Sequence, residues 1–285
     1  MPTLSYVSRY TTERHNAMEI QRDGRLTEHD RYWNLSHGPR LYYVLKAILK
    51  YVEERKPDHL SVLNMSGLNE GKPDPVLFDL LTMNYDRGNV SWSVVDHPES
   101  LTFTDPIVRQ WTEERGIRCI PRDHRQQVDL PDMPPADIVL CTEIIEHLDY
   151  SDMIALMRSC RAALKPGGIL ICTTPNILFL GYRVLFALGR WDSLHHNDEP
   201  DRVAQGLTGH TIYYDAKRLT RLLKLLNYSD IAATTFNAGH GPSQYRNLFT
   251  RTAAITLFAL SHIIPSSRQV LLVVASKPIL AEPNG

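Results

Sequence analysis

The chain has 285 residues, of which 43% are hydrophobic and 22% are charged, and these proportions exclude disordered and collagen-like proteins. Its 31 lysines and arginines nearly balance its 32 aspartates and glutamates, and the net charge of −1 argues against non-specific binding of nucleic acid. A chain of this length buries roughly three-quarters of the surface that it exposes when unfolded, so a large core is expected.

The cysteines and the apolar stretches indicate the compartment. None of the 4 cysteines belongs to a C-x-x-C pair, which predicts free thiols in a reducing environment. The N-terminal segment lacks the apolar run of a signal peptide. The longest apolar stretches, Ile177–Leu188 and Thr252–Ile264, are shorter than the roughly 20 residues that span a bilayer. We therefore expect a soluble, cytoplasmic protein without an integral membrane segment.

The N-terminal third of the chain predicts an arm followed by a helix, a strand and a second helix. Residues 1–38 show no sustained periodicity, so we expect an extended or partly helical arm. Apolar residues repeat at helical spacing from Pro39, a residue suited to a first helical turn. A strand over Leu60–Met65 comes next, and a helix starting at Asp74-Pro75 ends near Gly88.

Strands and helices then alternate regularly. The helices begin at Asp105-Pro106 and at Ser151, and the second of them is expected to stop at Lys165–Gly168. Nearly all-apolar strands separated by helices indicate an α/β fold with a parallel sheet covered on both faces. The further strands expected here are Val90–Val95, Ile117–Ile120, Ile138–Cys141 and Ile169–Cys172.

The regular alternation ends after Pro175. Asp215 is placed to cap a leucine-rich helix. Two apolar helices are expected to cap the carboxyl edge of the sheet or to form a homodimer contact, and the alternative is a lid over a lipid-linked acceptor. The elements expected in this part are helices at Ile177–Leu188 and Leu248–Ile263 and strands at Ile231–Phe236 and Val270–Ala275.

Residues that directly follow strands are the candidates for ligand binding, because ligands of open parallel sheets bind beyond the carboxyl ends of the strands. The first strand leads into a turn over Asn64–Gly71, whose glycines let the backbone approach a cofactor but lack the G-x-G-x-x-G spacing. The second strand ends in Asp96, an acid that could accept both hydroxyls of a ribose or cap the next helix.

Two later segments are more specific. Residues Ala136–Leu148 have the sequence A-D-I-V-L-C-T-E-I-I-E-H-L, and residues Leu164–Asn176 have the sequence L-K-P-G-G-I-L-I-C-T-T-P-N. Together they resemble the class I S-adenosylmethionine-dependent methyltransferases, in the group with an acid-His-Leu motif and a Thr-Pro-Asn end to the fifth strand. The resemblance covers roughly Leu60 to Pro278.

The resemblance implies an α/β, Rossmann-like, doubly wound and mostly parallel seven-stranded sheet whose last strand is antiparallel. Residues 1–58 would form a helical N-terminal extension. Residues 59–285 would form the methyltransferase domain, with cap insertions at about 177–210 and 237–268.

S-adenosylmethionine is the cofactor that the resemblance implies. Gly67 and Gly71 would lie beneath its methionine part, and Asp96 would hold its ribose. Asp123, or alternatively Asp129, would accept a hydrogen bond from the adenine amino group. The complete cofactor set is Asn64, Ser66, Gly67, Gly71, Asp96, Asp123, Thr142 and Glu143.

The first motif departs from the family pattern. The family usually has an acid where Asn64 stands and a G-x-G where Ser66-Gly67-Leu68 stands. This departure supports one alternative from another class, a non-catalytic scaffold that keeps the fold without productive cofactor binding.

Histidines are the candidate bases, since methyl transfer to oxygen needs alignment and a group that takes the proton. His147, His196 and His210 are the candidates. For each of them the alternative is structural: His147 could pack or cap the next helix, and His196 could be a solvated surface residue.

A metal-dependent alternative uses some of the same residues. Two carboxylates and two imidazoles suit a divalent cation, and the four residues resemble the metal quartet of small-RNA 3′-end 2′-O-methyltransferases. The balanced charge disfavours RNA, and a metal is not the favoured interpretation. The four residues are Glu143, Glu146, His147 and His210.

The favoured prediction is therefore S-adenosylmethionine-dependent O-methylation of a small-molecule acceptor, a sugar or another natural product. The acceptor class follows from the resemblance alone.

Overall fold

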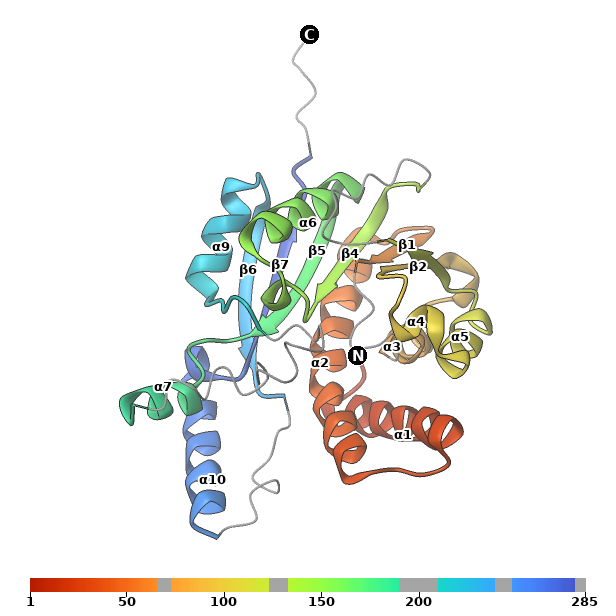
Figure 1. Ribbon diagram of the computed structural model, residues 1–285. Helices are drawn as coiled ribbons and strands as arrows, with labels where there is room; N and C mark the ends of the chain where they lie inside the picture. The colour runs from red at the N-terminus through yellow and green to blue at the C-terminus, as the bar shows by residue number, and fades with distance from the viewer. Residues whose placement is uncertain (66–72, 123–132, 190–209, 239–247, 280–285) are drawn as a thin grey trace.

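The computed structural model describes residues 1–65, 73–122, 133–189, 210–238 and 248–279 (Figure 1). A seven-stranded sheet lies at its centre in the order β3-β2-β1-β4-β5-β7-β6. Strands β1 to β5 run parallel, and β7 is antiparallel to both β5 and β6, as predicted. The strands are β1 (Leu60–Asn64), β2 (Val90–Asp96), β3 (Arg118–Pro121), β4 (Ala136–Thr142), β5 (Leu164–Pro175), β6 (Ser229–Phe236) and β7 (Val270–Ser276).

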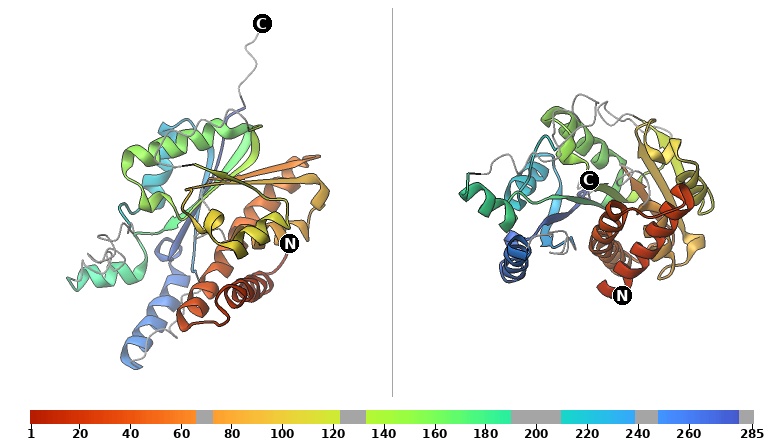
Figure 2. Two further views of the ribbon diagram at one scale, coloured as in Figure 1. Left: turned by 45° about the vertical axis from the view of Figure 1, so that its right-hand side comes forward. Right: turned by 60° about the horizontal axis from the view of Figure 1, so that its bottom comes forward.

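Helices cover both faces of the sheet (Figure 2). Alternate residues of a strand point to opposite faces, so each face has its own core. Ile138 and Leu140 of β4 pack with residues of α2 and α3, whereas Val139 and Cys141 pack with residues of α6 and α9. The longer helices are α1 (Leu4–Asp23), α2 (Glu28–Arg55), α3 (Pro73–Thr82), α5 (Pro106–Glu113), α6 (Tyr150–Ala163), α7 (Leu180–Ala187), α9 (Ala216–Leu225) and α10 (Leu248–Ile263).

The N-terminal segment is a pair of packed helices, and the expectation that Pro39 starts a helix is wrong. Pro39 lies inside α2, where it removes one backbone hydrogen bond. Contacts on both sides of the proline hold the helix together. Before it, the Asn34 amide donates to Asn16 Oδ1 of α1 (2.9 Å), and after it Leu41 is buried in the same cluster as Val7.

The helix before Lys165–Gly168 ends close to where it was predicted to stop, but the segment itself already belongs to β5. Helix α6 ends at Ala163, and Leu164 already pairs with Ala136 of β4. A Cβ atom on Gly168 would lie 2.9 Å from the carbonyl oxygen of Asp137, so the close approach of the two strands requires glycine there.

Two of the predicted helix caps are confirmed and one is corrected. Asp215 caps α9 by accepting from the backbone N–H of Arg218 (2.9 Å), and Asp105 caps α5. Helix α6 is capped by Asp149 and not by Ser151.

The 4 cysteines are free thiols. Within the described ranges, no helix has the length and apolar character needed to cross a membrane. The division of the chain at residue 58 stays a prediction.

We predict that Gly38→Ala destabilises the fold by about 1–3 kcal/mol, although alanine is the better helix former. The new Cβ would lie 2.7 Å from Ser8 Cα, so α1 and α2 would have to separate. Urea unfolding measures the loss. Gly88→Ala is the control, because its nearest neighbour would be 3.7 Å away. Equal midpoints for the wild type and Gly38→Ala would contradict the prediction.

Candidate functional site

The candidate site lies where β4 and β5 end. Thr142 is the last residue of β4 and pairs with Thr173 of β5. Glu143 follows with φ of +54°, a left-handed conformation that non-glycine residues rarely adopt, and its N–H donates to the carbonyl of Thr173 (2.9 Å). Such strain is typical of functional positions, where the surrounding structure holds it in place.

Glu143 forms a buried ion pair with Arg40 of helix α2. Arg40 Nη2 lies 3.0 Å from Glu143 Oε2, and the two side chains are 10% and 6% exposed. Among the residues that the structure describes, Glu143 Oε1 and Arg40 Nε have no hydrogen-bond partner. Buried polar atoms without partners are costly, so these two atoms are candidates to receive a ligand.

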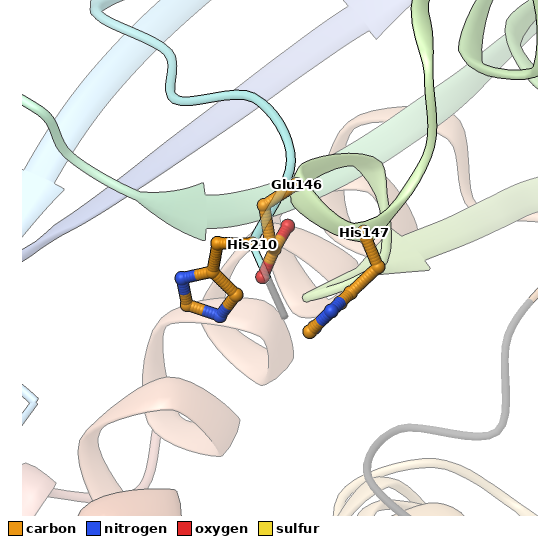
Figure 3. A group of neighbouring side chains, drawn as sticks. All are labelled: Glu146, His147 and His210. Atoms are coloured by element: carbon orange, nitrogen blue, oxygen red, sulfur yellow. The ribbon is translucent and has the colours of Figure 1, made fainter. Parts of the chain in front are cut away.

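Glu146, His147 and His210 form a compact cluster next to this pair (Figure 3). Each residue places one potential ligand atom within 4.8 Å of the other two. Glu146 and His147 belong to the short 3-10 helix Ile145–His147 after β4, and the two imidazole rings meet edge to face with centroids 4.8 Å apart. Figure 3 shows the Glu146 carboxyl group between the two rings.

Hydrogen bonds fix Glu146 within this cluster. Its Oε2 accepts from Thr174 Oγ1 (2.9 Å), and its backbone carbonyl accepts from the N–H groups of Thr211 and Ile212. The second contact holds His210 at the end of β4, although 63 positions of sequence separate His147 from His210. Burial, followed by the nearby carboxylate of Glu143, raises the pKa of Glu146 well above its usual range.

A series of rings continues from His210 toward helix α7. The rings of His210 and Tyr213 are 5.4 Å apart, those of Tyr213 and Tyr182 are 6.4 Å apart, and Tyr182 meets Phe179 at 5.4 Å. Burial raises the pKa of Tyr182, with Glu143 adding to the effect and Arg40 opposing it. Tyr182 therefore lies within electrostatic reach of the buried ion pair.

Asp96 ends β2, as predicted, and its carboxylate is already engaged. Oδ1 accepts from the N–H of His97 (2.8 Å), and Oδ2 accepts from Thr102 Oγ1 (3.0 Å). Asp96 is 8% exposed. These bonds orient the carboxylate. The role of Asp96 in holding a ribose stays a prediction.

Asn64 contacts Asp74, an acid that was predicted only to start a helix. Its amide donates to both oxygens of Asp74 (2.9 and 3.0 Å), and Trp92 Nε1 donates to Asp74 Oδ1 (2.9 Å). Asp74 is fully buried, and this burial raises its pKa to about 7. A buried carboxyl group thus lies beside the position where the family usually has an acid.

The remaining predicted site residues lie outside the described ranges. The positions concerned are Ser66, Gly67, Gly71, Asp123 (with its alternative Asp129) and His196.

Comparison with known proteins identifies the family. A family model described as "Methyltransferase domain" matches residues 69–233. The chain belongs to this methyltransferase family. The match includes β4 and β5 with the cluster at their ends, and it confirms the resemblance inferred from the two motifs.

Curated relatives match only part of the chain. Ubiquinone biosynthesis O-methyltransferases from two strains of Cereibacter sphaeroides are 32% identical over 71 residues and 35% identical over 75 residues. Each alignment covers 25% of this chain and 28% of the relative. The chain thus spans under a third of the length of these relatives.

Solved structures confirm the class I methyltransferase fold. The magnesium protoporphyrin IX methyltransferase from Synechocystis PCC 6803 with bound SAH aligns with a TM-score of 0.51 and 14% identity, covering 96% of this chain and 100% of that one. The citrinin polyketide synthase CMeT domain aligns with a TM-score of 0.56 and 13% identity, covering 92% of this chain and 59% of that one. At 13–14% sequence identity, the structural similarity to these two proteins shows a shared fold and nothing more.

We predict that Asp74 makes stability fall as pH rises. Between about pH 4 and pH 7 the folded protein holds a proton on Asp74 that the unfolded chain has released, so ionisation favours unfolding. From about pH 5 to pH 8 the wild type should lose about 2 kcal/mol relative to Asp74→Asn, which keeps a neutral acceptor in place. Urea unfolding at both pH values measures the difference.

Asp58→Asn, at an exposed position, is the control for loss of one carboxylate. If Asp74→Asn and the wild type change in parallel with pH, Asp74 has an ordinary pKa and the prediction is wrong.

Proposed function

We propose that this protein transfers a methyl group from S-adenosylmethionine to a hydroxyl group of a small molecule. The observation that carries the proposal is the cluster of Glu146, His147 and His210 directly beyond β4, within the segment that matches the methyltransferase family. The names of the curated relatives support oxygen as the accepting atom. A sugar or another natural product remains the proposed acceptor class.

The residues present suit the cofactor. Oε1 of Glu143 is a buried carboxylate oxygen without a hydrogen-bond partner in the described part of the chain, and it suits the ammonium group of a methionine moiety. Asp96 at the end of β2 suits the ribose hydroxyls. When bound, S-adenosylmethionine supplies an electrophilic methyl group on a sulfonium.

The protein then has two tasks, alignment of the acceptor and removal of its proton. The rings of Tyr182 and Tyr213 provide a wall beside His210 against which a flat acceptor can pack. The imidazole of His210 is proposed to take the hydroxyl proton as methyl transfer proceeds in line. His147 lies edge-on to this imidazole and is proposed to keep its orientation.

We predict that His210→Ala lowers kcat by about 100-fold or more and leaves affinity for S-adenosylhomocysteine nearly unchanged. The imidazole acts on the proton of the acceptor and not on the cofactor. Labelled methyl transfer to a panel of hydroxylated small molecules measures kcat, and calorimetry measures affinity. His59→Ala is the control, because His59 is exposed and contacts Ser91 away from the cluster.

The outcomes separate the alternatives. Absence of any binding heat for S-adenosylhomocysteine would contradict the proposal and favour a non-catalytic scaffold. Labelling of RNA 3′ ends in place of small molecules would contradict the acceptor class. Equal kcat values for wild type and His210→Ala would remove His210 from the chemistry.

A metal-dependent variant is the second candidate, and the spacing within 4.8 Å favours it. Glu146, His147 and His210 would hold a divalent cation, which would lower the pKa of the acceptor hydroxyl. Glu143, the fourth predicted ligand, is held instead by Arg40. The chain would therefore supply three ligands to the cation, and the remaining coordination positions would be open to the acceptor.

In this variant, dialysis against a chelator abolishes activity, and Mn²⁺ binds with one-to-one stoichiometry by calorimetry. His147→Ala and His210→Ala should each weaken Mn²⁺ binding about tenfold or more, because each removes one ligand. His59→Ala should bind Mn²⁺ like the wild type. Full activity after chelation and no Mn²⁺ heat would contradict this variant and leave His210 as the base.

A further inference from the structure

Asp74 carries a carboxyl group that is buried among neutral partners. It stands in the first turn of α3 and is 0% exposed. Within the described ranges its hydrogen-bond donors are the amide of Asn64 and the indole of Trp92. Neutral donors offset only part of the free energy needed to bury a carboxylate, which is usually paired with a cation. Ionised Asp74 is therefore a negative charge that the described residues do not neutralise.

Asp74 lies next to the edge of the sheet where the cofactor is expected. Its partner Asn64 is the last residue of β1, the strand between β2 and β4. In the register of β1 and β2, Asn64 lies opposite Val94, so Asp96 follows two positions further along. Burial is the largest cause of the raised pKa of Asp74, and the carboxylate of Asp96 raises this pKa further. The charges of Asp74 and Asp96 therefore act on one another across the two strand ends.

The other groups packed around α3 are apolar or are engaged elsewhere. Helix α2 contributes apolar side chains to the core that it shares with α3. Cys119 of β3 is a thiol whose pKa is raised by burial and by the charge of Asp74. Three arginines among the described residues contact α3 at other positions: Arg14 and Arg115 pair with Asp79, and Arg87 lies over the ring of Phe78. Two charged residues that precede α3 in the sequence lie outside the described ranges, namely Glu70 and Lys72.

The cofactor and its product differ in charge. S-adenosylmethionine carries a sulfonium cation, whereas S-adenosylhomocysteine has a neutral thioether at the same position. A fixed negative charge near the binding edge favours the cation. Buried groups with raised pKa values are typical of functional sites, and burial raises the pKa of Asp74 to about 7. Ionisation of Asp74 lowers the free energy of unfolding, so stability does not account for an acid at this position.

We propose that ionised Asp74 gives the protein a preference for S-adenosylmethionine over S-adenosylhomocysteine, acting through its electric field and without contact to either ligand. The family usually has an acid at the end of β1, where this chain has Asn64. The amide nitrogen of Asn64 holds the two carboxylate oxygens of Asp74 at 2.9 and 3.0 Å, directly beside that position. This role rests on the cofactor of the proposed function and is independent of the methyl acceptor.

Calorimetry of the full chain tests this role. The dissociation constants of S-adenosylmethionine and S-adenosylhomocysteine are measured without an acceptor at about pH 6 and about pH 8, on either side of the pKa of Asp74. At about pH 8, Asp74→Asn should lower the preference for S-adenosylmethionine about fivefold or more, because it removes one negative charge. At about pH 6 Asp74 holds its proton, so the same substitution should change the preference by less than about twofold.

A double variant separates the charge of Asp74 from its hydrogen bonds. Asn64→Asp combined with Asp74→Asn exchanges the two groups and keeps the net charge. The amide introduced on α3 can donate to the carboxylate introduced on β1 and can still accept from Trp92. This double variant should keep the wild-type preference within about twofold at about pH 8. Asp58→Asn is the matched control, because it removes an exposed carboxylate just before the opposite end of β1 and should leave the preference unchanged.

The outcomes distinguish this role from the proposed function. Equal preferences in the wild type and Asp74→Asn at about pH 8, with both ligands still bound, would overturn the role of Asp74 alone. Equal weakening of both ligands by Asp74→Asn would also overturn it, since that result indicates a structural role. A preference as low in the double variant as in Asp74→Asn would show that the charge is not the cause. Absence of binding of either ligand by the wild type would overturn this role and the proposed function together.

Discussion

The pairing of β4 with β5 is the constraint on which the rest of the site depends. At one end of the pair, the Asp137 carboxylate accepts from the Ser61 N–H and from Lys165 Nζ. At the other end, the backbone bond from Glu143 to Thr173 and the Thr174 hydroxyl on Glu146 fix the residues that follow β4. All seven residues of β4 are buried, and a one-residue shift in register would exchange the side chains that face the two cores.

The ion pair of Arg40 and Glu143 joins the N-terminal helices to this frame. A buried charge without its partner is strongly unfavourable, so Glu143 keeps its position only while α2 stays packed on the sheet. Helix α2 is in turn held by α1 through the close approach at Gly38. The helices before β1 are therefore part of the site and not only a support for it.

Sequence patterns predicted most of the strands and the caps at Asp105 and Asp215, because those signals are local, whereas α6 is capped by Asp149 and not by Ser151. Asp96 and Asp215 were placed correctly from the strand or helix beside them, and Glu146 with His147 came from a motif. Arg40 and Asp74 escaped detection as site residues because their partners are distant in sequence or depend on burial. Pro39 misled the helix boundary because tertiary packing outweighed a local preference.

The topology of the sheet explains why the connections after β5 and β6 begin at the same edge. Strand β5 ends at the carboxyl edge, and β6 runs in the same direction because β7 is antiparallel to both. The connections that follow β5 and β6 therefore both leave from this edge; β5 is the direct neighbour of β4, whereas β5 and β7 lie between β6 and β4. Helices α7 and α10 belong to these connections. Changes in these connections leave the packing of the sheet intact, so they can alter what approaches the site while the β4–β5 frame stays the same.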